Sequence, residues 1–300
     1  MVRLGDFMTV NNFISSIWSA KLLASLKKDQ VFTQAGVMNR DYTGEISGQG
    51  SVVKINGIGP VTIRPYVKNM PIVAPDTLSD AQTSLTIDQG NYFNFEVDDV
   101  DAAQQTPKIM TGAMEQASYD LTDTAEMYLA DLLYDGVPAG NKIGTDSDAG
   151  AIVPNATAGT TAYDYLVDLG TKLSEAKCPK TGRWVIIPPW YTGELAKDER
   201  FTNISASGSP EALRNGFVSR VAGFDVLESL NVPVITSEGK DNSEIIAGHG
   251  MAATYAEQIR KVEGYRPPDS FSDAVKGLHL FGAKVVRPTC MALLTARAVA

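Results

Sequence analysis

The chain has 300 residues, of which 44% are hydrophobic and 20% charged, a globular composition that excludes wholly disordered, collagen-like and coiled-coil proteins. Its 26 Lys and Arg against 35 Asp and Glu give a net charge of −9, which argues against a protein that binds nucleic acid by neutralising phosphates. Two histidines and two cysteines, Cys178 and Cys290, fit neither a zinc site nor a disulfide scaffold, and this cysteine usage indicates a cytosolic setting.

The first predicted element is an amphipathic helix over residues 12–28. Its apolar side chains, among them Phe13 and Trp18, recur in steps of three and four residues, and Lys27 and Lys28 stand at its carboxyl end, where the helix dipole favours cations. A single amphipathic helix cannot bury its apolar stripe by itself. We therefore expect it to lie on its own fold or on a neighbouring molecule.

A β-hairpin is predicted next. Residues 51–56 and 61–67 alternate apolar and polar side chains, and Gly57, Gly59 and Pro60 stand between them. An isolated two-stranded ribbon is only marginally stable in water. We expect this ribbon to rest on some other surface.

The longest predicted element is a helix over about 107–134. A strand-like segment, 92–97, and an acidic run precede it. Thr106 fits the N-cap, Pro107 fits the first helical position, and Gly136 follows the last apolar residue of the periodic pattern. At about 1.5 Å per residue the helix would be on the order of 40 Å long. That is longer than a small compact domain needs.

Helices and strands alternate in the second half. Residues 136–160 are rich in Gly and Pro and predict a long surface loop. The further predictions are helices over 163–177 and 190–197 and strands over 184–187, 221–227, 244–247, 252–259 and 278–286. This mixture predicts an α+β fold.

The catalytic and ligand-binding motifs point to no active site. His249 and His279 are the two possible members of a nucleophilic triad, and no Gly-x-Ser-x-Gly or phosphate-binding Gly-rich motif accompanies them. The acidic run 96–101 is better explained by a helix N-terminus than by a metal site. No apolar run approaches the roughly 20 residues of a membrane-spanning helix. We expect no enzyme, cofactor, metal or membrane partner.

Four segments follow one another in an order that resembles a known family. They are 88–104 (DQGNYFNFEVDDVDAAQ), 184–189 (WVIIPP) followed by Arg200 and Phe201, 215–226 (NGFVSRVAGFDV) followed by Ser229, and 271–288 (FSDAVKGLHLFGAKVVRP). Together with the terminal helix, the ribbon and the long helix, this order is similar to that of the major capsid (coat) proteins of tailed double-stranded DNA bacteriophages. Terminal arms and ribbons that cannot bury themselves also favour an assembled protein.

The resemblance implies a division into an N-terminal arm (1–36), an extended loop (37–91), a peripheral domain with a spine helix (92–160), an axial domain with part of the peripheral domain (161–265), and a return strand into the peripheral domain (266–300). Subunits would form pentamers and hexamers that close into an icosahedral shell around double-stranded DNA. The shell would be the capsid of the virion, assembled in the cytoplasm of the bacterial host. Portal and scaffolding or decoration proteins are implied as partners, with no scaffolding segment fused ahead of the arm.

The resemblance also suggests where subunits meet. Some relatives cross-link a Lys of the extended loop to an Asn of a neighbour; Lys54 is the candidate Lys, without an identified acceptor. We expect basic residues of the loop to lie over acidic residues of a neighbouring subunit, and the arm to contribute apolar contacts. The candidate contact residues are Lys54, Arg64, Lys68, Asp98, Asp99, Glu115, Phe13 and Trp18.

Two other interpretations stay open. One is an encapsulin-like shell protein of a bacterial compartment that encloses a cargo enzyme. The other is a soluble α+β enzyme, which a deep polar pocket around His249 with a perturbed carboxylate would favour.

Overall fold

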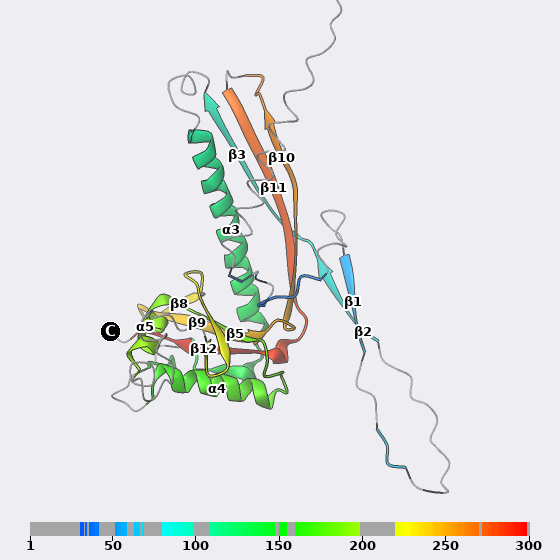
Figure 1. Ribbon diagram of the computed structural model, residues 1–300, viewed down its shortest axis with the longest axis vertical. Coiled ribbons are helices and arrows are strands. Elements are labelled where there is room, and N and C mark those ends of the chain that lie inside the picture. Colours follow the sequence, from blue (N-terminus) through cyan, green and yellow to red (C-terminus); the bar gives the residue numbers. More distant parts are fainter. Residues whose placement is uncertain are drawn as a thin grey trace, which may run out of the picture.

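The computed structural model describes residues 31–32, 34, 36–41, 52–58, 63–66, 68, 80–98, 108–147, 150–154, 160–198, 220–269 and 272–298. The expected helix over 12–28, with Phe13 and Trp18, lies outside the described residues, as does Asp99. Figure 1 shows a tall upper part in which a long helix runs beside long strands, a lower part built on a sheet, and a two-stranded ribbon that projects to one side.

The lower part is a seven-stranded mixed sheet. Its order is β4 (Lys142–Ile143), β12 (Met291–Ala296), β9 (Lys240–His249), β5 (Arg183–Ile187), β7 (Phe224–Glu228) and β6 (Arg220–Val221), with β8 (Val234–Ser237) paired to β9. All residues of β5 and β12 are buried. Strands buried on both faces need helices as cover, and α4 (Ala162–Glu175) and α5 (Pro189–Lys197) supply apolar side chains to this core.

The upper part joins α3 (Lys108–Gly136) to a three-stranded antiparallel sheet of β10 (Ala253–Tyr265), β11 (Ser272–Val285) and β3 (Gln89–Asp98). The predicted long helix is confirmed, and it ends at Gly136. Met114 and Leu121 of α3 pack with Val262 and Val275 of the sheet. Further along, Leu129 and Leu133 of the same helix enter the core of the lower part. No helix within the described residues is long and apolar enough to cross a membrane.

The ribbon pairs differently from the prediction. β1 (Val52–Ile58) is antiparallel to β2 (Asp80–Thr86), with Val53 opposite Leu85, so the predicted hairpin between 51–56 and 61–67 is wrong. Pro60 and Pro65 have no N–H to donate to a ladder, which disfavours the nearby segment as a partner. Residues 63–66 have no regular secondary structure. The connection between β1 and β2 is therefore long.

Three predictions for the second half need correction. The predicted strand 221–227 is two strands, β6 and β7, because the chain reverses at Ala222 and Gly223, both with positive φ. The predicted loop 136–160 contains a 3₁₀ turn, η2 (Ala139–Asn141), and β4, which pairs with β12. The predicted single return strand in 266–300 is two strands, because a second 3₁₀ turn, η4 (Pro288–Cys290), leads from β11 into β12, and they lie in different sheets.

Candidate assembly surfaces

The base of the ribbon is fixed to the body by buried apolar side chains. Leu85 and Ile87, at the end of β2 and just beyond it, pack with Ala256 of β10 and Leu280 of β11. A Cβ at Gly282 of β11 would lie only 2.4 Å from the carbonyl oxygen of Thr86. Glycine at this position therefore allows the two backbones to approach closely. The ribbon leaves the body from a rigid base.

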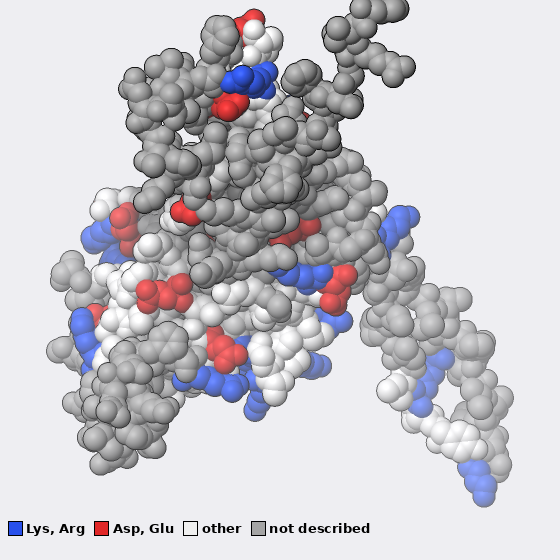
Figure 2. All heavy atoms as spheres, turned by 45° about the horizontal axis from the view of Figure 1, so that its top comes forward, with Lys and Arg blue, Asp and Glu red and all other residues white. Residues whose placement is uncertain are grey.

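The outer part of the loop is exposed and carries apolar side chains. Ile63 is 93% exposed and Tyr66 78% exposed, while Arg64 and Lys68 beside them are exposed cations. Figure 1 shows the segment 63–66 near the far end of the loop, well below β1 and β2. The described residues of this projection in Figure 2 are basic or uncharged, whereas both signs of charge mix over the visible body. A large apolar residue this exposed is typical of a contact surface.

The described basic candidates lie on the ribbon and its loop, whereas the described acidic candidates, Asp98 and Glu115, lie on the upper part of the same molecule. Lys54, on β1, is exposed. Glu115 is exposed on the first half of α3, and Asp98 is the last residue of β3, opposite Ser272. In Figure 1 the end of β3 is at the top, whereas β1 and the segment 63–66 lie lower, on the projecting ribbon and its loop. A contact between these two sets therefore requires two copies of the chain.

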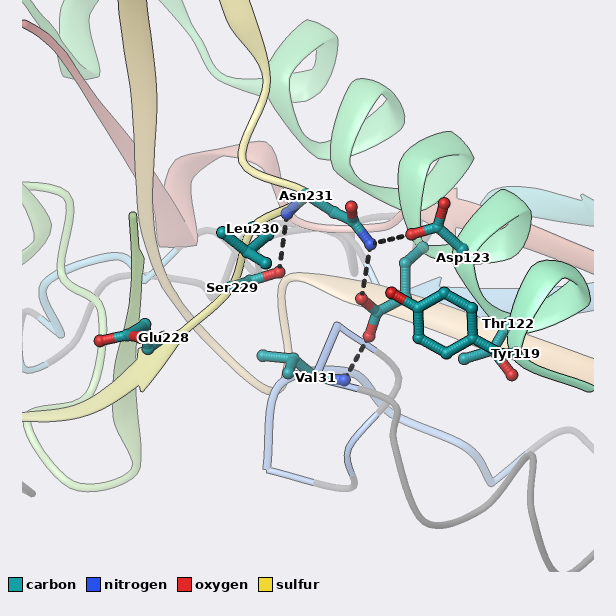
Figure 3. Close-up of a pocket in the computed structure, with 9 residues that line it drawn as sticks. Val31, Tyr119, Thr122, Asp123, Glu228, Ser229, Leu230 and Asn231 are labelled. Atoms are coloured by element: carbon teal, nitrogen blue, oxygen red, sulfur yellow. Dashed lines mark hydrogen bonds between the residues drawn. The ribbon is translucent and has the colours of Figure 1, made fainter. Parts of the chain in front are cut away.

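A pocket of about 280 Å³ lies where the arm joins the spine helix. Its lining residues come from the arm, from α3, and from the end of β7 with the segment that follows it: Val31, Tyr119, Thr122, Asp123, Glu126, Glu228, Ser229, Leu230 and Asn231. Figure 3 shows Asn231 directed toward α3 from one side and Val31 approaching from the other. Leu230, on its rim, is 85% exposed.

Glu126 joins the three segments around this pocket. It accepts hydrogen bonds from the backbone N–H of Val31, from that of Phe32 at 3.3 Å, and from Nδ2 of Asn231 at 3.1 Å. The same Asn231 Nδ2 donates to Asp123 at 2.7 Å, as the dashed lines of Figure 3 show in part. Burial raises the pKa of Glu126 above its ordinary value, while the N–H of Val31 and the amide of Asn231 partly offset this by stabilising the carboxylate.

Glu126 therefore fixes the position from which the arm departs. Phe32, Val37 and Met38 are fully buried in the main core, so the chain that follows the hydrogen bonds is also held against the body. Sequence reasoning did not single out Glu126. The sequence did contain a signal for its role. Thr122, Glu126 and Leu129 are spaced so that they fall on one helical face, and a carboxylate on an apolar face needs hydrogen-bond partners.

Both histidines lie within structural networks. His279 is fully buried, with Nε2 3.7 Å from Oε2 of Glu257. Burial alone would raise the pKa of Glu257, but the neighbouring His279 and Arg40 lower it overall. His249 is the last residue of β9, and its Nδ1 accepts the N–H of Met251 at 3.1 Å. The pocket described above is lined by neither histidine.

Within the described residues, no group of three or more His, Cys, Asp and Glu side chains could hold a metal ion.

Comparison with known proteins identifies the architecture. Residues 80–294 match the family described as phage capsid protein. The chain belongs to this family. A structure of Mycobacterium phage Che8 is similar at 30% sequence identity and a TM-score of 0.71, covering 89% of this chain and 91% of that one. The capsid of cyanophage P-SCSP1u is similar at 17% identity and a TM-score of 0.70, covering 91% and 89%. No curated protein sequence matches the chain.

The predicted family, the α+β capsid fold and the role as a structural protein that forms shells are thus confirmed. The same fold occurs in the virus-like particle from Pyrococcus furiosus, at 16% identity and a TM-score of 0.53 over 94% of this chain and 99% of that one. Because the family match is to phage capsid proteins, the compartment interpretation is less supported. The chain is a component of the virion.

Proposed function

We propose that this phage capsid protein is the major subunit of an icosahedral shell, assembled from pentamers and hexamers, that encloses double-stranded DNA. Assembly would take place in the cytoplasm of the bacterial host, with portal and scaffolding or decoration proteins as partners. The proposal keeps the division into arm (1–36), extended loop (37–91), peripheral domain (92–160), axial domain (161–265) and return segment (266–300). The exposed loop tip is the observation that carries it.

The tip favours association because it leaves apolar surface in water. A side chain such as Ile63 or Tyr66 gains roughly 1.5–3 kcal/mol when it is fully buried. The net charge of −9 makes copies repel one another, so apolar burial has to drive assembly and salt should help by screening. The same charge limits tight binding of the enclosed DNA, since like charges repel.

The loop is proposed to contact the acidic end of a neighbour. Lys54, Arg64 and Lys68 would lie over Asp98, Asp99 and Glu115 of the next subunit, while Phe13 and Trp18 of the arm would supply apolar contacts. The separation of the two charged sets within one chain supports a contact between copies. Exposed pairs of this kind contribute about 0–1 kcal/mol each, so several are needed to bias assembly.

Charge reversal tests this contact. The double variant K54E/R64E is expected to reduce the yield of closed shells, measured by sedimentation and negative-stain electron microscopy. The matched control is K180E, because Lys180 is an exposed cation in the turn after α4. Adding E115K to the double variant should restore part of the yield. Unchanged assembly of K54E/R64E would refute the contact.

The enclosed genome needs a separate measurement. Particles purified from infected host cells and treated with nuclease should retain double-stranded DNA, with hexamers and pentamers resolved in the shell. Particles that contain a protein cargo and no DNA would instead support the compartment interpretation.

A further inference from the structure

The two cysteines, far apart in sequence, lie in contact in the fold. Their thiols are within hydrogen-bond contact of one another, and Cys178 and Cys290 are 5% and 7% exposed. The sequence analysis argued against a disulfide scaffold, but both residues are buried in the main core. Both thiols are free.

The backbone around Cys178 is held from two sides. The N–H of Cys178 donates to Leu173 O at 3.0 Å and that of Lys177 to Ser174 O at 3.1 Å, with Lys177 at φ 61°, which is a Schellman motif that ends α4. The buried guanidinium of Arg183 then donates to the carbonyl of Cys178 at 2.8 Å. Cys178 therefore has little freedom to turn away from its neighbour.

Cys290 is held in a comparable way. It ends the turn η4, where its N–H donates to Arg287 O at 3.1 Å, and the fully buried strand β12 begins at the next residue. A bond between the two sulfurs would join positions that already touch. It would tie the end of helix α4 to the beginning of strand β12, closing a long loop of chain.

We propose that Cys178 and Cys290 are an oxidation site that forms a disulfide within one subunit when the assembled protein meets a hydroperoxide. One thiolate attacks the peroxide oxygen, which gives a sulfenic acid and releases hydroxide, and the proton lost from the thiol converts this to water. The second thiol displaces the hydroxyl group of the sulfenic acid, so the disulfide forms and a second water is released. Two thiols and one hydrogen peroxide thus give one disulfide and two waters.

The surroundings set the rate of this reaction. Burial and the neighbouring Cys290 together raise the pKa of Cys178 to about 11, although Arg183 opposes the change. Since the thiolate is the reactive form, oxidation should be slow at neutral pH and faster in alkali. Such a slow reaction fits a disulfide that forms after the particle has left the reducing cytosol and entered an oxidising medium. Disulfides persist in extracellular particles.

Peroxide treatment of wild-type shells tests the proposal. The treated protein is unfolded, alkylated with N-ethylmaleimide and weighed as an intact chain. Apart from the oxygen added to each oxidised methionine, we expect a mass lower by two hydrogens, no alkylation, a monomeric band on a non-reducing gel, and reversal of the two-hydrogen loss by dithiothreitol. Oxidation of the exposed Met251 shows that the peroxide has acted. Alkylation of both cysteines after Met251 is oxidised, or a disulfide between two chains, would overturn the proposal.

Single variants separate the bridge from general oxidation. In C290A the sulfenic acid of Cys178 has no partner, so sulfinic acid or unreacted thiol is expected and no disulfide. Peroxide should raise the melting temperature of wild-type shells and leave that of C178A shells unchanged. An equal increase in both would refute a stabilising disulfide. The mass measurement on wild-type protein remains decisive if either variant folds poorly.

Discussion

Replacement of Glu126 by Leu should destabilise the junction between the arm and the spine helix. The variant E126L removes the acceptor for two backbone N–H groups, of Val31 and Phe32, and one of the two acceptors for Asn231. A buried donor without a partner costs about 1–3 kcal/mol. Phe32 is fully buried and Val31 partly so, and the added apolar side chain offsets some of the loss. We expect a net cost of about 2–4 kcal/mol.

Calorimetry and hydrogen exchange measure this effect. For a chain of this size the melting temperature should fall by roughly 5–10 °C, and the amide of Phe32 should exchange faster than in the wild type. E126Q keeps an acceptor for the arm and should lose only about 1 kcal/mol. The matched control is D131L, an exposed carboxylate on the same helix, expected to change stability by less than about 0.5 kcal/mol. Equal stability of E126L and D131L would refute the reasoning.

Two further predictions concern the interior and the ribbon. Burial raises the pKa of Glu244 to about 7, so its protonated form is favoured in the folded protein; the stability this provides is full below the unfolded pKa and is lost as the pH rises through about 7. E244Q should therefore show a smaller fall in melting temperature between pH 5 and pH 8, and a parallel fall would contradict the assignment. G282A places a Cβ 2.4 Å from Thr86 O and should loosen the ribbon base, seen as faster amide exchange in β2, whereas G193A, with open space around the Cβ, should leave it unchanged.

Local patterns predicted the elements whose signals lie within a short stretch of chain. The periodicity after Pro107 located α3, and the apolar run at 184–187 located β5, because both elements depend on neighbouring residues. The order of segments was enough to indicate the capsid family. Strand pairing over longer sequence separations was harder to predict. β2, the partner of β1, follows a long connection, and the nearer alternating segment 61–67 was predicted as the partner instead.

The candidate sites follow the same rule. The exposed cations of the loop could be proposed from sequence because exposure is what a polar, Gly-punctuated segment predicts. The hydrogen bonds of Glu126 and the contact between Cys178 and Cys290 could not be predicted in this way, because each joins segments that meet only in the tertiary structure. The strand β12 was also missed, although every one of its residues is buried, because a short apolar run at the end of a chain does not by itself distinguish strand from helix.

Because α3 enters the apolar cluster of the upper part and that of the lower part, it constrains how the subunit can change shape. Met114 and Leu121 pack in the upper cluster and Leu129 and Leu133 in the lower one, with unbroken helix between them. Any pivot between the two parts would have to break helical hydrogen bonds or separate packed side chains. Copies that sit at positions of unequal curvature must therefore differ in segments other than the packed length of α3.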